Sequence, residues 1–206
     1  MSAPSRPRHP AGRVARTAVR RPPARRRLPL ALTGTPGTGK SSVARHLAAR
    51  WSVVEVAELA RSHRAARRLR RGIEVDLARL RRALRRPGAL ADVDLVVGHL
   101  AHLLPVRGAI VLRCRPIELR RRLRNARRGT AREREANFAS EALDQVLGEA
   151  AATGLPVFEI DTTGRSAAAV AREVERRLVR SGPPRHGTVD WLADRAVTAQ
   201  LLDGAR

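Results

Sequence analysis

The stretch Gly34-Thr35-Pro36-Gly37-Thr38-Gly39-Lys40-Ser41 decides the fold of this chain of 206 residues. It fits the pattern G-x-x-x-x-G-K-[ST], in which a glycine-rich turn joins a strand to a helix. The apolar run Leu30–Thr33 before it is typical of a buried strand, and a helical pattern over residues 41–50 follows it. This context indicates a phosphate-binding loop rather than an ordinary turn.

The residue types of the loop explain how it would hold phosphates. Glycine permits backbone conformations that turn successive N–H groups inward, and the following helix adds the positive end of its dipole. The Lys40 ammonium can reach the β- and γ-phosphates, and the Ser41 hydroxyl can bind Mg²⁺. We therefore expect ATP with Mg²⁺ as the ligand and Ser41 as the metal-binding residue. Phosphate contacts are expected from Gly34, Gly37, Thr38, Gly39, Lys40 and Ser41.

The charge of the chain is strongly positive. It carries 42 Lys and Arg against 19 Asp and Glu, a net charge of +23. Such a balance favours polyanionic partners such as RNA or DNA, although a general bias toward arginine explains it equally well. Lys40 is the only lysine. Because a compact ammonium and a planar guanidinium are not interchangeable at a phosphate site, its retention supports a specific task.

The rest of the chain alternates between strand and helix. Further strands are expected at residues 52–56, 94–97, 109–112 and 156–160. Helices are expected at 57–86, from Pro116 through Leu123, after Gly129 with Phe138, Ala142, Val146 and Ala150 on one face, at 167–180 and at 189–202. Strands separated by helices imply a parallel sheet covered on both faces. The predicted class is α/β, a P-loop NTPase fold with a five-stranded parallel sheet and small acceptor and lid segments.

Three parts of the chain differ in composition. Residues 1–27 are rich in arginine and proline and lack acids, so we expect a disordered basic tail: an arm for nucleic acid, a targeting peptide or a solvated extension. Residues 28–180 form the predicted P-loop domain, and residues 181–206 form a C-terminal linker and helix. No apolar run approaches the roughly 20 residues of a membrane helix. We therefore expect no membrane partner. Because Cys114 is the single cysteine and no disulfide can form within the chain, we expect a cytoplasmic location.

A candidate lid lies in the arginine-rich stretch 124–134. Phosphoryl transfer needs positive charge over the transferred group, and small nucleotide kinases supply it from arginines on a mobile lid. Arg128, just before the hinge-like Gly129, is the best candidate. Arg120, Arg121 and Arg122 are interpreted as solvated helix surface.

Several stretches are distinctive enough to carry a resemblance. They are the phosphate loop continued by Ser42, the specific stretch Val-Gly-His-Leu-Ala-His-Leu-Leu-Pro at 97–105, and residues 111–116, 128–129, 137, 141–144 and 158–163. Together they resemble the adenylate kinase isoenzyme 6 family, also known as coilin-interacting nuclear ATPases, in its archaeal branch. The resemblance covers roughly residues 30–191.

The resemblance implies a nucleoside monophosphate kinase that uses ATP and AMP and also hydrolyses ATP. It further implies help in small ribosomal subunit maturation together with a ribosomal protein. By position, Ser42 joins the ATP-binding residues, and Arg128 becomes the arginine of a lid over about residues 127–136. His99 becomes the histidine of the second nucleotide motif, with a capping or core histidine as the alternative. Residues of about 55–75 would hold the acceptor, and catalysis would fall to Lys40, Arg128 and His99.

Two departures from the family pattern bear on activity. Val97 stands two residues before His99, where the family carries the acid that organises Mg²⁺. Asp94 lies three residues back, at ~3.3 Å per residue toward the wrong end of the strand, so we expect weakened chemistry with ATP binding retained. The acceptor stretch is rich in arginine where relatives are often acidic. The alternative function is therefore a catalytically weak ATP-binding assembly factor that contacts ribosomal RNA, and a kinase for another small acceptor is a third.

Overall fold

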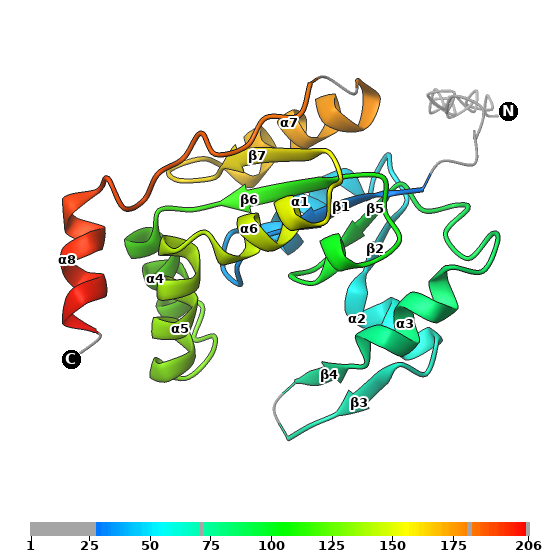
Figure 1. Ribbon diagram of the computed structural model, residues 1–206, viewed down its shortest axis with the longest axis horizontal. Helices are drawn as coiled ribbons and strands as arrows, with labels where there is room; N and C mark the ends of the chain where they lie inside the picture. Colours follow the sequence, from blue (N-terminus) through cyan, green and yellow to red (C-terminus); the bar gives the residue numbers. More distant parts are fainter. Residues whose placement is uncertain (1–27, 71, 181–182, 205–206) are drawn as a thin grey trace, which may run out of the picture.

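The computed structural model describes residues 28–70, 72–180 and 183–204, so the predicted tail of residues 1–27 lies outside the described residues. Its centre is a parallel sheet of five strands in the order β2-β5-β1-β6-β7 (Figure 1). The strands are β1 (Leu30–Thr33), β2 (Val53–Glu55), β5 (Leu95–Val97), β6 (Ala109–Arg113) and β7 (Val157–Asp161). Parallel strands need long crossovers, and helices provide them here. The predicted α/β P-loop fold is confirmed.

Helices cover both faces of this sheet because successive strand residues point to opposite sides. In β1, Leu32 packs in the core beneath α1 (Lys40–Leu47) and α7 (Ala167–Val179). Its neighbour Ala31 packs in the core on the other face. That face is covered by α2 (Val56–Ser62), α3 (Leu77–Leu84), the 3₁₀ turn η1 (Ala101–Leu103) and α6 (Gln145–Ala152). Both cores consist almost entirely of Leu, Val, Ile and Ala.

The prediction of one helical segment over residues 57–86 is wrong. After α2 the chain forms an antiparallel hairpin of β3 (Ala66–Arg68) and β4 (Ile73–Val75), and α3 begins only then. Arg64 ends α2 with a positive φ of 53°, and the Ala65 amide donates back to the Ala60 carbonyl. This hydrogen bond closes the last turn of a helix, so the basic run that follows is free to become a strand.

The single long helix expected after Gly129 is also divided. α4 (Pro116–Asn125) begins at its proline as predicted, and α5 (Ala131–Ala142) and α6 follow as separate helices. Asp144 lies between α5 and α6 with φ at 55°, and its carboxylate pairs with Arg113 on β6. A residue in the left-handed region interrupts a helix, and this ion pair holds it there.

The C-terminal helix starts later than predicted. Residues 189–194 are not helical, and α8 spans Arg195–Asp203. Before it, Arg185 bonds to β7, accepting from the Glu159 amide at 2.8 Å and donating to the Val157 carbonyl at 3.0 Å. Trp191 and Val197 then pack against α5, where Phe138 is buried. Within the described ranges, no helix combines the length and apolar character needed to cross a membrane.

Candidate nucleotide site

The phosphate loop lies where β1 ends and α1 begins, at the carboxyl edge of the sheet. Gly34 has a φ of 135°, and a Cβ atom there would come within 2.3 Å of the Leu112 carbonyl oxygen. A Cβ atom on Gly37, whose φ is 100°, would meet Leu123 of α4 at 2.9 Å. Both positions therefore require glycine, because neighbouring elements pack directly onto the loop backbone.

Lys40 folds over the loop. Its Nζ donates to the Gly34 carbonyl at 2.6 Å and to the Thr35 carbonyl at 3.0 Å. Burial lowers the pKa of Lys40 to about 8, although the carboxylates of Glu141 and Glu55 act in the opposite direction. A phosphate oxygen is a stronger partner for an ammonium than a carbonyl, so nucleotide phosphates can displace these two contacts.

Side chains that sequence reasoning missed hold the loop from behind. The Thr35 hydroxyl donates to Glu141 Oε2 at 2.5 Å, and the Thr162 hydroxyl lies 3.1 Å from the Thr38 carbonyl. Glu141 is only 2% exposed, and its other oxygen accepts from the Cys114 amide at 3.0 Å. The links of Thr35 to Glu141 and of Thr38 to Thr162 each cross more than a hundred residues of sequence, so no local pattern points to them.

A buried arginine fixes Glu141. The Arg113 side chain is 2% exposed and pairs with Glu141 at 2.9 Å, with Glu159 at 2.6 Å and with Asp144. Burial by itself would lower the pKa of Arg113, but the carboxylates, Glu141 first, outweigh it and raise the pKa. Trp191 adds a donor to Glu141 Oε1 at 3.3 Å, and its ring centre lies 5.9 Å from the Arg113 guanidinium carbon.

His99, which follows the end of β5, lies beside the phosphate loop. The Thr33 hydroxyl donates to the His99 carbonyl at 3.1 Å and contacts Nδ1 of the buried His102 at 3.0 Å. His99 itself is exposed and so is not a core histidine. Partial desolvation, followed by the positive charge of Lys40, lowers the pKa of His99 below 6.5. A neutral imidazole at this edge is able to accept a proton or a hydrogen bond from a ligand.

The end of β5 is apolar. Val97 is fully buried in the core beneath α1. Asp94 lies at the start of β5 instead, where its carboxylate accepts from the Ser52 amide at 2.8 Å. It is therefore far along the strand from the loop, as its sequence position implies.

Arg128 of the candidate lid and Arg122 of α4 lie in different surroundings. Arg128 is exposed in the segment between α4 and α5, and Thr130 and Glu133 form a capping box that starts α5. The interpretation of Arg122 as solvated surface is wrong, because its Nη2 donates to the Thr162 carbonyl at 2.9 Å. Thr162 also bonds to the loop, so Arg122 lies closer to the candidate phosphate site than sequence reasoning placed it.

The hydroxyls that follow Lys40 are suited to a metal that a nucleotide brings with it. Ser41 is exposed, and Ser42 is half-buried and accepts from Arg45 at 3.3 Å. Among the described residues, no group of three or more His, Cys, Asp or Glu side chains forms a metal cage. Mg²⁺ commonly binds through one or two protein ligands, substrate phosphates and water, so this donor set fits Mg²⁺ delivered with ATP.

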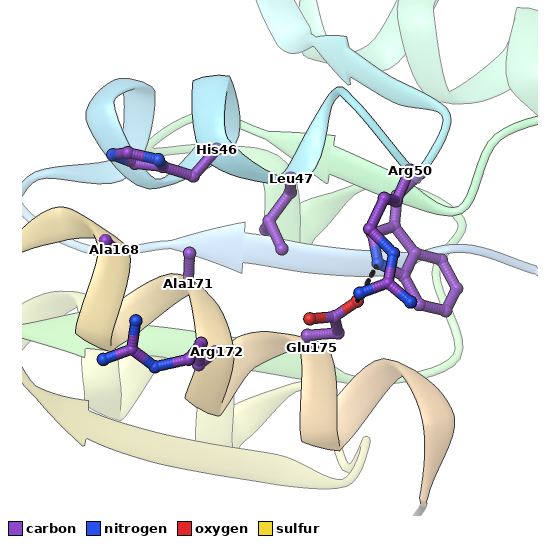
Figure 2. A pocket seen from close by; sticks show the side chains of 8 residues that line it. His46, Leu47, Arg50, Ala168, Ala171, Arg172 and Glu175 are labelled. Atoms are coloured by element: carbon purple, nitrogen blue, oxygen red, sulfur yellow. Dashed lines mark hydrogen bonds and ion pairs between the residues drawn. The ribbon is translucent and has the colours of Figure 1, made fainter. Parts of the chain in front are cut away.

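A separate groove lies at the other end of α1, between α1 and α7 (Figure 2). It encloses about 210 Å³ and includes Arg50, Trp51 and Glu175. Glu175 pairs with Arg50 at 2.8 Å and accepts from Trp51 Nε1 at 3.2 Å. These three side chains therefore satisfy one another, and the groove is distinct from the phosphate loop.

The strand, the loop and the helix that follows it identify the class of protein. A central β1 followed by a glycine-rich loop, a lysine and a serine makes this a P-loop protein built to bind a nucleoside triphosphate. Residues 30–144 match the family model described as AAA domain.

Similar proteins identify the family within this class. A protein of Archaeoglobus fulgidus is 41% identical over 172 residues, which cover 80% of this chain and 92% of the relative. One from Thermococcus onnurineus is 34% identical over 175 residues, covering 84% and 96%. Both carry the name "Putative adenylate kinase". The chain therefore belongs to the same family as these archaeal proteins.

A solved structure agrees at the level of fold. An uncharacterized protein from Eubacterium ventriosum has a TM-score of 0.50 at 9% identity, covering 74% of this chain and 99% of its own. The shikimate kinase from Acinetobacter baumannii has a TM-score of 0.46 at 14% identity, covering 74% and 93%.

Proposed function

We propose that the protein is a nucleoside monophosphate kinase that transfers the γ-phosphoryl group of Mg·ATP to AMP. In the absence of acceptor it would hydrolyse ATP slowly. The observation that carries this proposal is the phosphate loop, with Lys40 held over it by two carbonyls that phosphates can replace. The names of the archaeal relatives support the choice of AMP. Within the family, the stretch at 97–105 favours the isoenzyme 6 group.

The chain places basic segments on two sides of this loop. Figure 1 shows α4 and α5 on one side of the view and α2, α3 and the β3–β4 hairpin on the other. We assign the acceptor to residues of about 55–75 and the lid to residues of about 127–136. In this assignment Arg128 would cover the transferred phosphoryl group, and His99 would contact the nucleotide at the end of β5. Mg²⁺, when bound, neutralises charge on the phosphates.

The test is ADP formation by the purified chain with ATP and Mg²⁺, with and without AMP. Strong stimulation by AMP is expected, and Lys40→Ala should abolish turnover in both conditions. A matched control is Arg172→Ala, because Arg172 is an exposed cation on α7. ATP binding without turnover in either condition would reject the kinase.

A second function is favoured by the charge of the α2–α3 region. Its arginines are exposed and form no ion pair within the described residues, whereas Arg121 and Arg122 of α4 pair with Glu118. These unpaired residues are Arg61, Arg64, Arg67, Arg68, Arg70, Arg79, Arg81, Arg82, Arg85 and Arg86. Unpaired arginines suit a phosphate backbone. The alternative is thus a catalytically weak ATP-binding factor that assists small ribosomal subunit maturation in the cytoplasm through ribosomal RNA, rather than through a basic ribosomal protein.

Salt-dependent RNA binding separates the two functions. Replacing Arg67, Arg68 and Arg70 by Ser should weaken binding and reduce the slope of log affinity against log salt by about one for each RNA phosphate that is no longer bound. Replacing the exposed Arg172, Arg176 and Arg180, on α7 and at its C-terminal end, removes the same charge from another surface and should have little effect. Equal effects of both triple variants, or no binding at low salt, would reject an RNA surface in this region.

A further inference from the structure

The candidate metal site lacks its usual acid. In P-loop proteins Mg²⁺ is held by the serine or threonine of the loop and by an aspartate at the end of a neighbouring strand. Here β5 neighbours β1, but it ends in Val97, which is fully buried and apolar. Some other carboxylate has to serve if the protein is to hold Mg·ATP as P-loop proteins do.

The strand beyond β5 carries such a group. Glu55 is the last residue of β2, and the register pairs it directly with Val97. Neighbouring strands lie about 4.8 Å apart, so the Glu55 backbone is one strand further from the loop than the usual position. Paired residues in a parallel sheet point to the same face, and Val97 faces α1. Val53, two residues before Glu55, packs on that face too.

The surroundings leave the Glu55 carboxylate available. Glu55 is exposed, and although it occupies the N-cap position of α2 its side chain makes no capping hydrogen bond. Its charge acts to raise the pKa of the buried Lys40 ammonium. A glutamate also reaches one methylene further than an aspartate, and Mg²⁺ keeps several of its waters, which extend the reach of a carboxylate.

Two other acids, Glu141 and Asp94, are less suitable. Glu141 also acts on Lys40, but it is 2% exposed and is occupied by donors from Thr35, Arg113 and Cys114. Asp94 lies at the opposite end of β5 and is bound to the Ser52 amide.

We propose that Glu55 holds the Mg²⁺ of bound Mg·ATP through the metal's coordinated water, together with the Ser41 hydroxyl, and so replaces the acid absent at Val97. The inference rests on the proposed binding of ATP and assigns Glu55 a metal role inside the segment otherwise given to the acceptor. Replacing Glu55 therefore affects the contribution of Mg²⁺ to ATP binding and leaves metal-free ATP binding intact.

The test is calorimetric titration of the full chain with ATP, with and without Mg²⁺. In the native protein Mg²⁺ should tighten ATP binding. In Glu55→Gln this tightening should shrink by about tenfold, the lower end of the effect known for groups that act on a metal through its ligands. Glu58→Gln is the matched control, because Glu58 is an exposed glutamate on the first turn of α2. It should keep the native Mg²⁺ effect.

A rescue variant sharpens the result. Val97→Asp in the Glu55→Gln background returns an acid to β5 and should restore the Mg²⁺ effect. Should the buried aspartate prevent folding, the comparison of Glu55→Gln with Glu58→Gln decides alone. The proposal is overturned if Glu55→Gln retains the native Mg²⁺ effect, if Glu58→Gln loses as much, or if Glu55→Gln changes only AMP affinity. A native chain that binds no ATP in either condition overturns the proposed function and this inference together.

Discussion

At the scale of single residues, Lys40 shows how the fold adjusts a side chain for its task. Its ammonium is buried against two carbonyls of the loop, and burial lowers its pKa from 10.5 to about 8. An anionic phosphate raises the pKa of a neighbouring ammonium. The proton on Lys40 is therefore held more tightly in the ATP complex than in the free protein.

This difference predicts a pH dependence of ATP binding. Below pH 8 Lys40 is protonated in both states, so affinity is at its full value. Above pH 8 the free protein loses the proton that the complex needs, and affinity should fall by up to about tenfold per pH unit. Calorimetry at pH 7, 8 and 9, in buffers of different ionisation enthalpy, measures both the affinity and the proton uptake.

The control for this titration is Lys40→Arg. Arginine stays charged over the whole range, so its profile should be flat although binding is weaker. Because Lys40 is the only lysine, no other lysine titrates in this range. Burial raises the pKa of Cys114 to about 11, so this thiol does not titrate near pH 8 either. A flat profile for the native protein would contradict the role assigned to Lys40.

At the scale of elements, the ends of β6 and α5 are joined by buried charge. Arg113 on β6 pairs with Glu141 of α5, with Asp144 after it and with Glu159 on β7. Because Asp144 interrupts the helix, this one arginine also fixes the direction in which the chain enters α6. The carboxylate that holds Thr35 is thus positioned by an ion pair behind it.

Removing this arginine should destabilise the fold strongly. Arg113→Met leaves buried carboxylates without a cation, and loss of one partner of a buried pair costs about 3–5 kcal/mol. Arg115→Met is the comparison, because Arg115 pairs with Asp194 while 41% exposed and an exposed pair contributes about 0–1 kcal/mol. Urea unfolding measures both, and similar small losses would show that the Arg113 pairs are not structural.

At the scale of the whole molecule, the C-terminal segment reaches the phosphate loop through one carboxylate. Before α8, Arg185 hydrogen-bonds to β7. Trp191 then donates to Glu141, which binds the Thr35 hydroxyl. Lys40 also contacts the Thr35 carbonyl, so we expect a change at the loop on nucleotide binding to reach Trp191 through these contacts. The described part of the C-terminal segment, residues 183–204, therefore packs against the domain.

Trp191 should report ATP binding by its fluorescence. Trp51→Phe leaves Trp191 as the sole tryptophan, and ATP should change its emission in parallel with calorimetric binding. In this background Thr35→Ser keeps the hydroxyl and should preserve the response, whereas Thr35→Val should abolish it. Trp191→Phe is the control, since Trp51 lies in the groove between α1 and α7. Identical responses of the serine and valine variants would argue against this connection.

Much of the fold could be predicted because its signals are local. The loop pattern, Pro116 and the apolar strands lie within a few residues of the elements that they specify. The hairpin after Ser62 was missed because a run of exposed arginines has no period that separates strand from helix. The division after Ala142 was missed for a different reason, since it depends on the pairing of Asp144 with Arg113 on another element.

The sequence by itself determined the phosphate loop, the alternation of strand and helix, the basic charge and the family, because each depends on residue type and spacing along the chain. Only the tertiary structure decided which carboxylates surround the loop. Glu141 comes to Thr35 through the packing of α5, and Glu55 comes beside Val97 through the register of β2 against β5. Such contacts form between segments that lie far apart in the sequence, and no local pattern of side chains indicates that these segments meet.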